Sequence, residues 1–383
     1  MRKFIKTLGV FSLTGALLVG CGTNSEKASE EKETVTVWSS GSENVKNTYE
    51  MLADAFNSSE YGDKYKMNVE FISSGSGAQS LRDRTIAAAK SGKTDTNYDL
   101  IEVADAELAA YYYEGGEDFF ETIDKSKISN SKDVIAETST GKDVLLPYRG
   151  TTVVLAYNSD KVSTPPKTTE ELYQWIKDNK GRFAYNTPGT GGAGFSFAAT
   201  AIYNDLPKEA LTSSDAKWKE EWQPGFDLLT ELHPYLYQSG GKTVYPHKNQ
   251  GTLDLLANQE IDMAPVWVDQ IVNQKKMGIL PESIEMVQID PALTGNLATL
   301  AIPKIGGNSE GAYAVMDFMI SEEAQTILLD EMGAFPVIDT DKLKSDNTEM
   351  LSEFDVSEFR TSSLGVLLAD FLKKWDEEIA TLK

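Results

Sequence analysis

The sequence predicts an α/β fold in two lobes, each a mostly parallel sheet flanked by helices, with two crossing strands joining the lobes. Three observations support this prediction. The chain has 383 residues, more than one hydrophobic core usually organises. Strand-turn-helix units repeat in both halves of the chain. Between the halves lies Leu145 to Val162, an alternating β-branched strand ending in a turn, which we interpret as one half of a hinge.

Residues 1–20 are typical of an export signal. The basic stretch MRKFIK precedes an apolar run, LGVFSLTGALLVG, that is too short to span a bilayer comfortably. Leu18 to Cys21 has the form of a bacterial lipobox, in which the cysteine becomes the lipid-bearing N-terminus. Cys21 is the single cysteine, so the sequence offers neither a disulfide framework nor thiol catalysis. Residues 21–33 indicate a flexible tether, and we expect an extracytoplasmic body that a lipid anchors to the cell membrane.

The charge balance argues against nucleic acid as a partner. The formal net charge is −23, from 36 basic and 59 acidic residues. Leaving out Arg2, Lys3 and Lys6, which lie in the predicted signal, gives 33 − 59, or −26. Such a surface repels nucleic acid and anionic lipid. It would attract cationic solutes, but the better-supported interpretation is simply the well-solvated surface of an exported protein.

Residues 34–150 are predicted to form the first lobe. The predicted strands are Thr34–Trp38, Lys66–Ile72 and Tyr98–Val103. A helix with a capping box at Ser40 to Glu43 follows the first strand, and helices at Ala78–Ser91 and from about Ala106 follow the others. Three such units in a row favour a parallel sheet with its loops at one edge, where ligands bind in sheets of this type.

Residues 151–293 are predicted to form the second lobe. A capping box at Thr168 to Glu171 opens a helix that ends near Gly181. The remaining predicted elements are a strand at 182–185, a glycine-rich loop at 186–194, a helix at 195–203, a helical stretch at 217–236 broken at Pro224 and Pro234, a helix at 252–258, a strand at 261–267 and a helix at 268–277.

Residues 294–383 are predicted to return to the first lobe and to end in helices. The strand Leu297–Pro303 is the expected second half of the hinge, and a helix follows from Ser309. The tail from Thr361 to Lys383 has the apolar spacing of a long amphipathic helix, which core packing explains without any function.

Several of these features together resemble the extracellular solute-binding proteins of ABC importers. They are the lipobox, the repeated units, the central strand ending Ala-Tyr-Asn-Ser-Asp-Lys, and the Phe-x-x-Ser-x-Glu-Ala-Gln run within Ala314 to Gln325. That run recurs in the family's iron(III), polyamine and thiamine binders. Leu232–Leu236 and Ile289–Pro303 are most similar to the Ynj-type branch.

The resemblance implies a two-lobed, periplasmic-binding-protein-like (Venus flytrap) fold. It further implies a monomer that captures a small polar solute in the cleft between the lobes. Closure about the hinge would couple solute capture to docking on the membrane subunits of an ABC permease, with no cofactor and no reaction.

The loops predicted to face the cleft supply the candidate solute-binding residues. They are Trp38, Ser39, Ser40, Gly41, Ser74, Gly75, Ser76, Asp105, Tyr148, Arg149, Thr187, Gly191, Gly192, Trp267, Asp269, Gly295 and Asn296. The Ser/Gly-rich turns open helices and therefore favour an anionic group. Arg149 either binds such a group or braces the lobes through an ion pair.

Other candidates favour the opposite charge. Trp38, Tyr148 and Trp267 suit a cation or an aromatic ring, with Asp105 and Asp269 as counter-charges. Core packing is the alternative use of each tryptophan. A zwitterion, or a cation that carries a phosphate ester, would satisfy both sets, so the charge of the solute stays open.

Two other readings of the sequence are weaker. Gly189 to Gly194 matches G-x-G-x-x-G, but the strand-end acid of a dinucleotide site is missing, which disfavours a nucleotide-dependent enzyme on the same scaffold. A surface adhesin or scaffold remains the other alternative.

Tyr111 to Tyr113 could donate oxygen ligands to iron(III), although consecutive helical residues diverge, and neither His233 nor His247 has metal-binding spacing. We therefore expect no metal site and no catalytic residue.

Overall fold

The computed structural model describes residues 32–73, 78–138, 140–345, 347–351, 354 and 358–382. Lys32–Lys383 forms one compact unit. The predicted signal peptide, Cys21 and nearly all of the tether lie outside the described residues, as do Ser74, Gly75 and Ser76.

The N-terminal part contains the three predicted strand-helix units. Strands β1 (Glu33–Gly41), β2 (Tyr65–Ser73) and β3 (Leu100–Ala104) are parallel, in the order β2-β1-β3. Helices α1 (Glu43–Ser58), α2 (Leu81–Lys90) and α3 (Leu108–Gly115) follow them. The carboxyl ends of the strands therefore lie at one edge of the sheet, as predicted. We call these elements, with α9 (Ser309–Met319) and α10 (Glu322–Met332), the first lobe.

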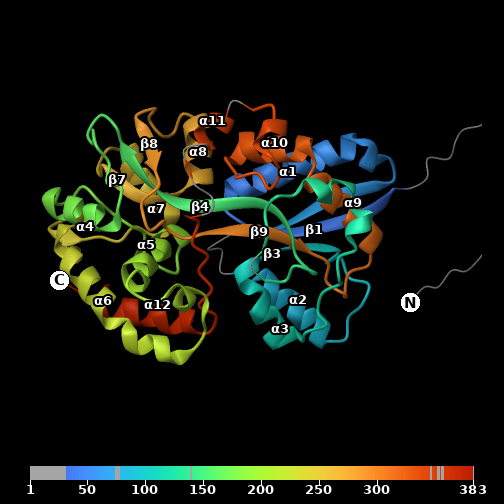
Figure 1. Ribbon diagram of the computed structural model, residues 1–383, viewed down its shortest axis with the longest axis horizontal. Helices are drawn as coiled ribbons and strands as arrows, with labels where there is room; N and C mark the ends of the chain where they lie inside the picture. Colours follow the sequence, from blue (N-terminus) through green and yellow to red (C-terminus); the bar gives the residue numbers. More distant parts are fainter. Residues whose placement is uncertain are drawn as a thin grey trace, which may run out of the picture. The chain divides into compact units, whose positions relative to one another are not determined.

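Two long strands connect the first lobe to the rest of the chain. Strand β4 (Leu146–Asn158) pairs through Leu146 to Thr152 with the antiparallel strand β9 (Gly295–Ala301). Beyond Thr152, β4 pairs with β7 (Met263–Trp267) and β8 (Ile284–Val287) instead. Figure 1 shows β4 and β9 running side by side between the two groups of helices. The two predicted crossing strands are therefore confirmed.

The sheet beyond β4 differs from the prediction of a mostly parallel sheet in each lobe. Both neighbours of β4 there, β7 and β8, are antiparallel to it. The predicted strand at 182–185 is reduced to one parallel bridge, between Phe183 and Met263. Strand β4 enters this region as a single long strand, and β7 and β8 run back along it in the opposite direction. The overall class is a mixed sheet covered by helices.

The second group of helices covers this part of the sheet, and with β7 and β8 we call it the second lobe. Its helices are α4 (Thr169–Asp178), α5 (Gly192–Tyr203), α6 (Gln223–Leu232), α7 (Lys248–Ala257), α8 (Val268–Lys276) and α12 (Leu367–Glu378). A small hairpin, β5 (Gln238–Ser239) and β6 (Lys242–Thr243), lies between α6 and α7 in the chain, and α11 (Thr348–Leu351) precedes α12.

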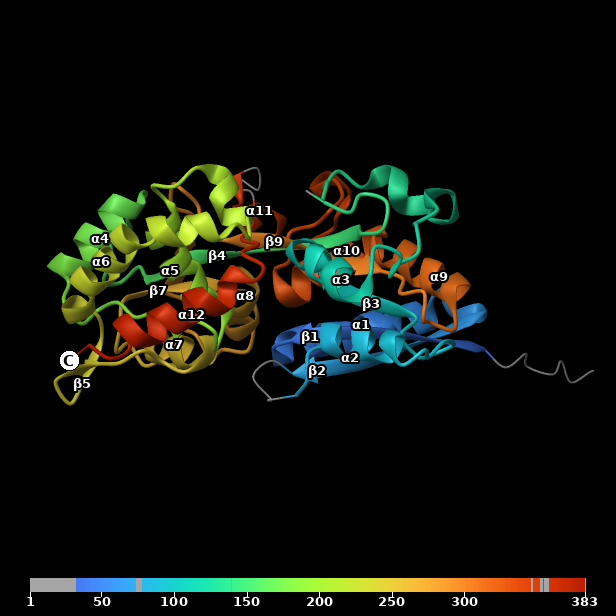
Figure 2. The same ribbon diagram turned by 90° about the horizontal axis from the view of Figure 1, so that it is seen from below.

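The C-terminal helix packs in the second lobe and not with the returning strand. It begins at Leu367, later than the predicted start at Thr361. Phe371 contacts the rings of Phe195, Trp222 and Phe226, and the Trp375 indole lies 3.3 Å from the Tyr185 hydroxyl. Figure 2 shows α12 on the same side as α5 and α7. The amphipathic pattern predicted the helix, while the partner face came from residues far away in the chain.

Of the two predicted capping boxes, only the one at Thr168 gives a side-chain cap, and its Glu171 carboxylate accepts from the N–H of Lys167, one residue before the cap. The Thr168 side chain accepts a hydrogen bond from Glu171 N–H at the start of α4. Ser40, by contrast, is still part of β1, and the residue before α1 is Ser42, which makes no side-chain cap. Its hydroxyl donates instead to Asn44 Oδ1, so the first turn of α1 stays uncapped.

Candidate solute-binding site

A cavity of about 740 Å³ lies where the lobes meet β4 and β9, and we call it the interlobe cavity. Its wall comes from the carboxyl ends of β1 and β3, from β4 and β9, and from the first residues of α1, α5, α7 and α8. The predicted candidates that line it are Ser40, Gly41, Arg149, Gly191, Gly192, Trp267, Asp269 and Asn296. Four helices thus begin at one cavity, which is the arrangement expected of loops gathered at the carboxyl edge of a sheet.

Close packing explains the glycines at the start of α5. A Cβ on Gly192 would lie 2.7 Å from Cζ2 of Trp267, so the indole rests against the helix backbone. A Cβ on Gly191 would lie 2.3 Å from Oδ1 of Asn249. Any side chain at these two positions would therefore push Trp267 or Asn249 away from the cavity wall.

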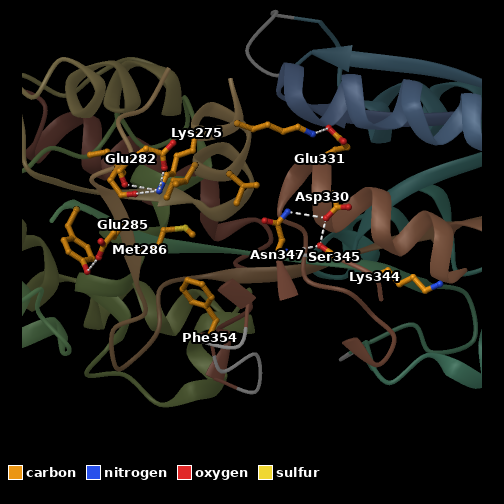
Figure 3. Close-up of a pocket in the computed structure, with 15 residues that line it drawn as sticks. Lys275, Glu282, Glu285, Met286, Asp330, Glu331, Lys344, Ser345, Asn347 and Phe354 are labelled. Carbon is orange, nitrogen blue, oxygen red and sulfur yellow. Dashed lines mark hydrogen bonds and ion pairs between the residues drawn. The ribbon is translucent and has the colours of Figure 1, made fainter. Parts of the chain in front are cut away.

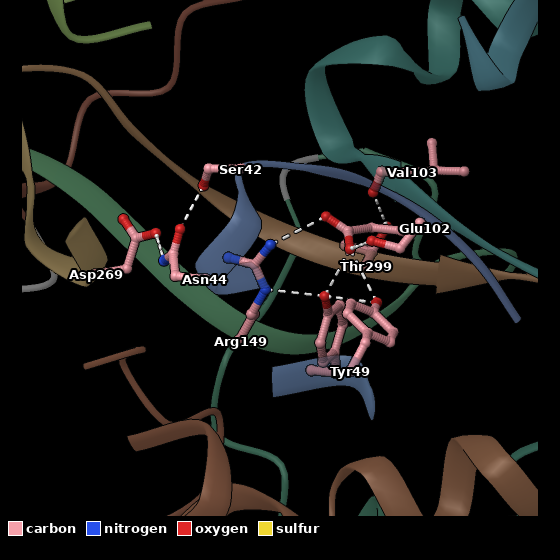
Figure 4. A network of polar contacts seen from close by, with 10 residues as sticks. Ser42, Asn44, Tyr49, Glu102, Val103, Arg149, Asp269 and Thr299 are labelled. Carbon is pink, nitrogen blue, oxygen red and sulfur yellow. Dashed lines mark hydrogen bonds and ion pairs between the residues drawn. The ribbon is translucent and has the colours of Figure 1, made fainter. Parts of the chain in front are cut away.

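On the first-lobe side, Arg149 belongs to a buried polar network (Figure 4). Its Nε donates to the Tyr148 hydroxyl at 2.8 Å, and its Nη2 donates to Glu102 Oε1 at 3.1 Å. The other oxygen of Glu102 accepts from the hydroxyls of Ser39, Tyr49 and Tyr148. Burial raises the pKa of both tyrosines, so they remain hydrogen-bond donors at neutral pH.

Arg149 therefore makes an ion pair, one of the two roles that the sequence left open. Only 6 % of Arg149 is exposed, and Glu102 lies on β3 of the first lobe. The pair thus ties β4 to β3 and does not bridge the two lobes. Its Nη1 has no acceptor within the described part of the chain, although Arg149 lines the cavity.

One hydrogen bond crosses from lobe to lobe at the cavity. Asn44 Nδ2, in the first turn of α1, donates to Asp269 Oδ2, in the first turn of α8, at 2.8 Å. Asp269 is only 6 % exposed. Burial raises the pKa of Asp269, and the Asn44 amide and the charge of Arg149 oppose this shift. Figure 4 shows Asp269 and Asn44 facing each other beside Arg149.

Trp38 and Asp105 lie outside the cavity lining. The indole of Trp38 is 9 % exposed, donates to the carbonyl of Asn97 at 2.9 Å and packs 5.0 Å from the Tyr98 ring. Asp105 is buried and accepts from the backbone N–H of Thr140 at 3.2 Å. Both residues follow a strand, but their side chains turn back into the first lobe.

Three further candidates also lie outside the lining. Tyr148 is fully buried beneath the cavity, where it supports Arg149. The backbone N–H of Thr187 donates to the carbonyl of Pro246, within the second lobe. Gly295 packs against β4, where a Cβ would lie 2.8 Å from the carbonyl oxygen of Thr151.

Comparison with known proteins decides the family. Residues 51–350 match the family described as bacterial extracellular solute-binding protein. The chain belongs to this family. A curated relative, the protein YnjB of Escherichia coli strain K12, is 26% identical over 211 residues, which cover 54% of this chain and 54% of the relative. The match thus spans about half the length of that relative, and it agrees with the predicted Ynj-type resemblance.

Solved structures show the same fold. An ABC transporter substrate-binding protein from Bradyrhizobium japonicum USDA 110 has a TM-score of 0.67 and 17% identity, and the match covers 91% of this chain and 100% of that one. A ferric binding protein from Campylobacter jejuni has a TM-score of 0.64 and 15% identity, with 90% and 99% covered. The predicted two-lobed periplasmic-binding-protein fold is therefore confirmed.

Family membership implies an extracytoplasmic protein that binds a small solute. The family and these structures are transport binding proteins and not enzymes. Within the described part of the chain, no helix is both long enough and apolar enough to cross a membrane.

The cavity of this solute-binding protein has further lining residues that the sequence pattern did not single out. They are Ser42, Glu43, Val45, Glu102, Ala104, Glu107, Thr151, Thr190, Lys248, Asn249, Gln250, Gln270 and Ala298. Glu102 carried a usable signal, because it is the one charged residue of the apolar strand β3. Lys248 to Gln250 follow no predicted strand, so position alone could not have found them.

Two acceptors in the cavity wall lack a donor. They are Oε1 of Gln270 and Oδ1 of Asn296, and neither has a partner among the described residues. Leaving a buried acceptor unsatisfied costs roughly 1–3 kcal/mol. These two acceptors are therefore unsatisfied, unlike the carboxylate of Glu102, whose two oxygens both accept hydrogen bonds.

A larger cavity, of about 1070 Å³, lies between α8 and β8 on one side and α10 with Lys344, Ser345, Asn347 and Phe354 on the other (Figure 3). Its polar side chains are largely bonded to one another. Lys275 pairs with Glu282, Lys276 pairs with Glu331, and the hydroxyl of Tyr157 donates to Glu285 at 2.7 Å. The predicted loops do not reach this cavity, so we favour the smaller one as the solute site.

The motifs that suggested other functions have structural roles. Tyr111 is 1 % exposed and packs on Phe119 and Phe120, while Tyr113 is 87 % exposed, so the tyrosines diverge as expected. His233 is buried, with Nδ1 2.9 Å from the Tyr245 hydroxyl. Across residues 32–73, 78–138 and the later described ranges, no three His, Cys, Asp or Glu side chains gather as a metal site would need.

Proposed function

We propose that this solute-binding protein holds its solute in the interlobe cavity and closes its lobes about β4 and β9. The observation that carries the proposal is the composition of the wall, to which both lobes contribute through the starts of α1, α5, α7 and α8. A solute that touches both lobes binds the closed state better than the open state, and this difference alone drives closure.

The hinge geometry supports this mechanism. Each of β4 and β9 makes a single passage between the lobes, and their pairing is continuous apart from an irregularity between Pro147 and Arg149. The direct Asn44–Asp269 hydrogen bond offers a contact that forms as the lobes approach and is lost as they separate. Docking on the permease would then read the closed state.

We also propose that the protein is a monomeric lipoprotein. Residues 1–20 would direct export and be removed, and Cys21 would carry the lipid, with the following residues as a tether. Replacing Cys21 by alanine should then release the protein from the membrane fraction and abolish its labelling by palmitate. Retention of the Cys21→Ala protein in the membrane would contradict the anchor.

The experiment that tests the solute-binding role is a thermal-shift screen of the soluble body, Asn24 to Lys383, refolded to remove carried-over solute. The compounds would be thiamine and its phosphates, polyamines, iron(III) complexes, aminophosphonates, amino acids and sugars. A solute at a hundredfold excess over its dissociation constant should stabilise the folded state by about 2.7 kcal/mol. A shift with no compound class would instead favour the adhesin or scaffold alternative.

A matched pair of variants ties the shift to the cavity. Asn249→Ala changes a wall residue at the start of α7, next to Gly191. Gln238→Ala changes a residue of the small β5–β6 hairpin, which does not line the cavity. Asn249→Ala should reduce the thermal shift that the solute produces, and Gln238→Ala should leave that shift unchanged.

A further inference from the structure

Two residues of the interlobe cavity wall have a buried side-chain acceptor without a donor among the described residues. Gln270 is only 8 % exposed, and its Oε1 has no partner among the residues described. Asn296 Oδ1, on β9, is in the same situation. Both residues line the cavity. Buried acceptors of this kind are ordinarily paired, so a group with several N–H bonds is the natural complement of this wall.

A carboxylate and an aromatic ring stand beside these acceptors. Asp269 immediately precedes Gln270 and is buried, with Asn44 as its side-chain donor. Trp267, one residue before α8, lies with its ring against Gly192. An amide oxygen, a carboxylate and an indole within residues 267–270 make a set that receives an ammonium group through hydrogen bonds, charge and the ring face.

The first-lobe side presents donors without acceptors. Arg149 is 6 % exposed, and Tyr148 and Glu102 hold its Nε and Nη2. Its Nη1 has no acceptor among the described residues, and Arg149 lines the cavity. The neighbouring first turn of α1 has no side-chain cap. A guanidinium fixed in this way, next to the positive end of a helix of 16 residues, suits a carboxylate.

The charges of the wall disfavour a solute of one sign. Four acids line the cavity, Glu43, Glu102, Glu107 and Asp269, against two bases, Arg149 and Lys248. A dianion would meet the surplus of carboxylates, and a dication would place one charge beside Arg149. We propose, building on the function proposed above, that the solute is a small zwitterion, with its ammonium at Asp269 and Gln270 and its carboxylate at Arg149 and the start of α1.

Three sets of matched probes test this proposal: ω-amino acids, α,ω-diamines and α,ω-dicarboxylates, each with chains of two to six carbons. Isothermal titration calorimetry on the mature chain, stripped of carried-over solute, would give the affinities. At the best chain length, the amino acid should bind at least about tenfold more tightly than the diamine and the dicarboxylate of equal length.

Two variants assign the two ends of the solute. Asp269→Asn keeps the volume of the side chain and removes its charge. It should therefore weaken the binding of amino acids and diamines by about tenfold or more and leave the binding of dicarboxylates unchanged. Arg149→Lys keeps the charge but loses the planar guanidinium with its paired N–H donors. It should therefore weaken the binding of amino acids and dicarboxylates and leave the binding of diamines unchanged. Glu282→Gln, a second-lobe change at a side chain that is 90% exposed, is the control and should alter none of the affinities.

The outcomes separate this proposal from the function itself. Tighter binding of diamines or dicarboxylates overturns the zwitterion and leaves a solute-binding cavity. Equal loss of all probe classes in Asp269→Asn, with Tm unchanged, overturns the assignment of the ammonium end. Failure of every probe, together with no small molecule released when the freshly purified protein is denatured, counts against solute binding in this cavity and overturns both.

Discussion

The two sides of the interlobe cavity differ in how completely their polar groups are paired. On the first-lobe side, Glu102 accepts from three hydroxyls and from Arg149. On the second-lobe side, Gln270 Oε1 has no donor, and Asp269 reaches across to Asn44 on the other lobe. On the first side the carboxylate of Glu102 is thus fully paired and only the outer edge of Arg149 stays open, whereas on the second side the acceptor of Gln270 is open. Removing a partner of Glu102 should therefore cost more stability than removing the acceptor of Gln270.

The largest effect is expected for Arg149→Ala, which leaves Glu102 as a buried carboxylate without its counter-charge. Breaking a buried pair in this way costs about 3–5 kcal/mol of unfolding free energy. Urea unfolding of the unliganded protein would measure it. A negligible loss would contradict the structural role of the ion pair with Glu102, while Arg149→Lys tests the contact with the solute separately.

Arg182→Ala is the matched control for this variant. Arg182 also pairs with a carboxylate, Asp262, but its side chain is 36% exposed. Solvent screening should keep its loss well below that of Arg149→Ala. Equal losses of unfolding free energy in the two variants would mean that burial does not determine how much the Arg149–Glu102 pair stabilises the fold.

A smaller effect is expected for Asn44→Ala, which removes the side-chain donor to buried Asp269. A hydrogen bond to a charged group contributes about 1.5–3 kcal/mol. Because the bond joins the lobes, its loss should also widen the protein in solution, which small-angle X-ray scattering would detect as a larger radius of gyration. An unchanged radius together with unchanged stability would show that the lobes do not rely on this contact.

The pH dependence of stability should report on Asp269. Because burial raises its pKa in the folded state, the folded protein binds this proton more tightly than the unfolded chain does. The stabilisation that Asp269 contributes to the folded state is therefore fully present below the ordinary carboxyl pKa. It is lost as the pH rises through the raised pKa of the folded state. Relative to Asp269→Asn, the wild type should lose unfolding free energy between pH 4 and neutral pH, as urea titrations at each pH would show. A difference that stays constant with pH would contradict the raised pKa.

The smallest effect on stability is expected for Gln270→Leu. Removing an unpaired acceptor takes away a desolvation penalty, so the unliganded protein should be unchanged or more stable by up to about 1 kcal/mol. The same change should weaken binding of the solute, because it removes an acceptor from the cavity wall. Thermal melts with and without solute would measure both. A clear loss of stability in the absence of solute would show that Gln270 has a structural partner.

Local patterns predicted much of the scaffold. Alternating β-branched residues placed β1 to β3 and β4, and the Thr168 capping box placed the start of α4. Position after a strand correctly placed Asp269 and Trp267 at the cavity, because strand ends gather at one edge of the sheet. The same rule also nominated Trp38 and Asp105, which turn into the first lobe, since position does not specify the direction of a side chain.

By itself, therefore, the sequence determined the strand-helix units, the two connecting strands and the family, because these depend on short-range periodicity and on runs of neighbouring residues. Tertiary structure alone decided which strands pair with β4 and which helices receive α12. It also decided the contacts that distinguish the two sides of the cavity. Glu102 meets Arg149 across 47 positions of the chain and Asn44 meets Asp269 across 225. No local pattern encodes such pairs, because they form only when packing of the whole chain brings distant segments to the same place.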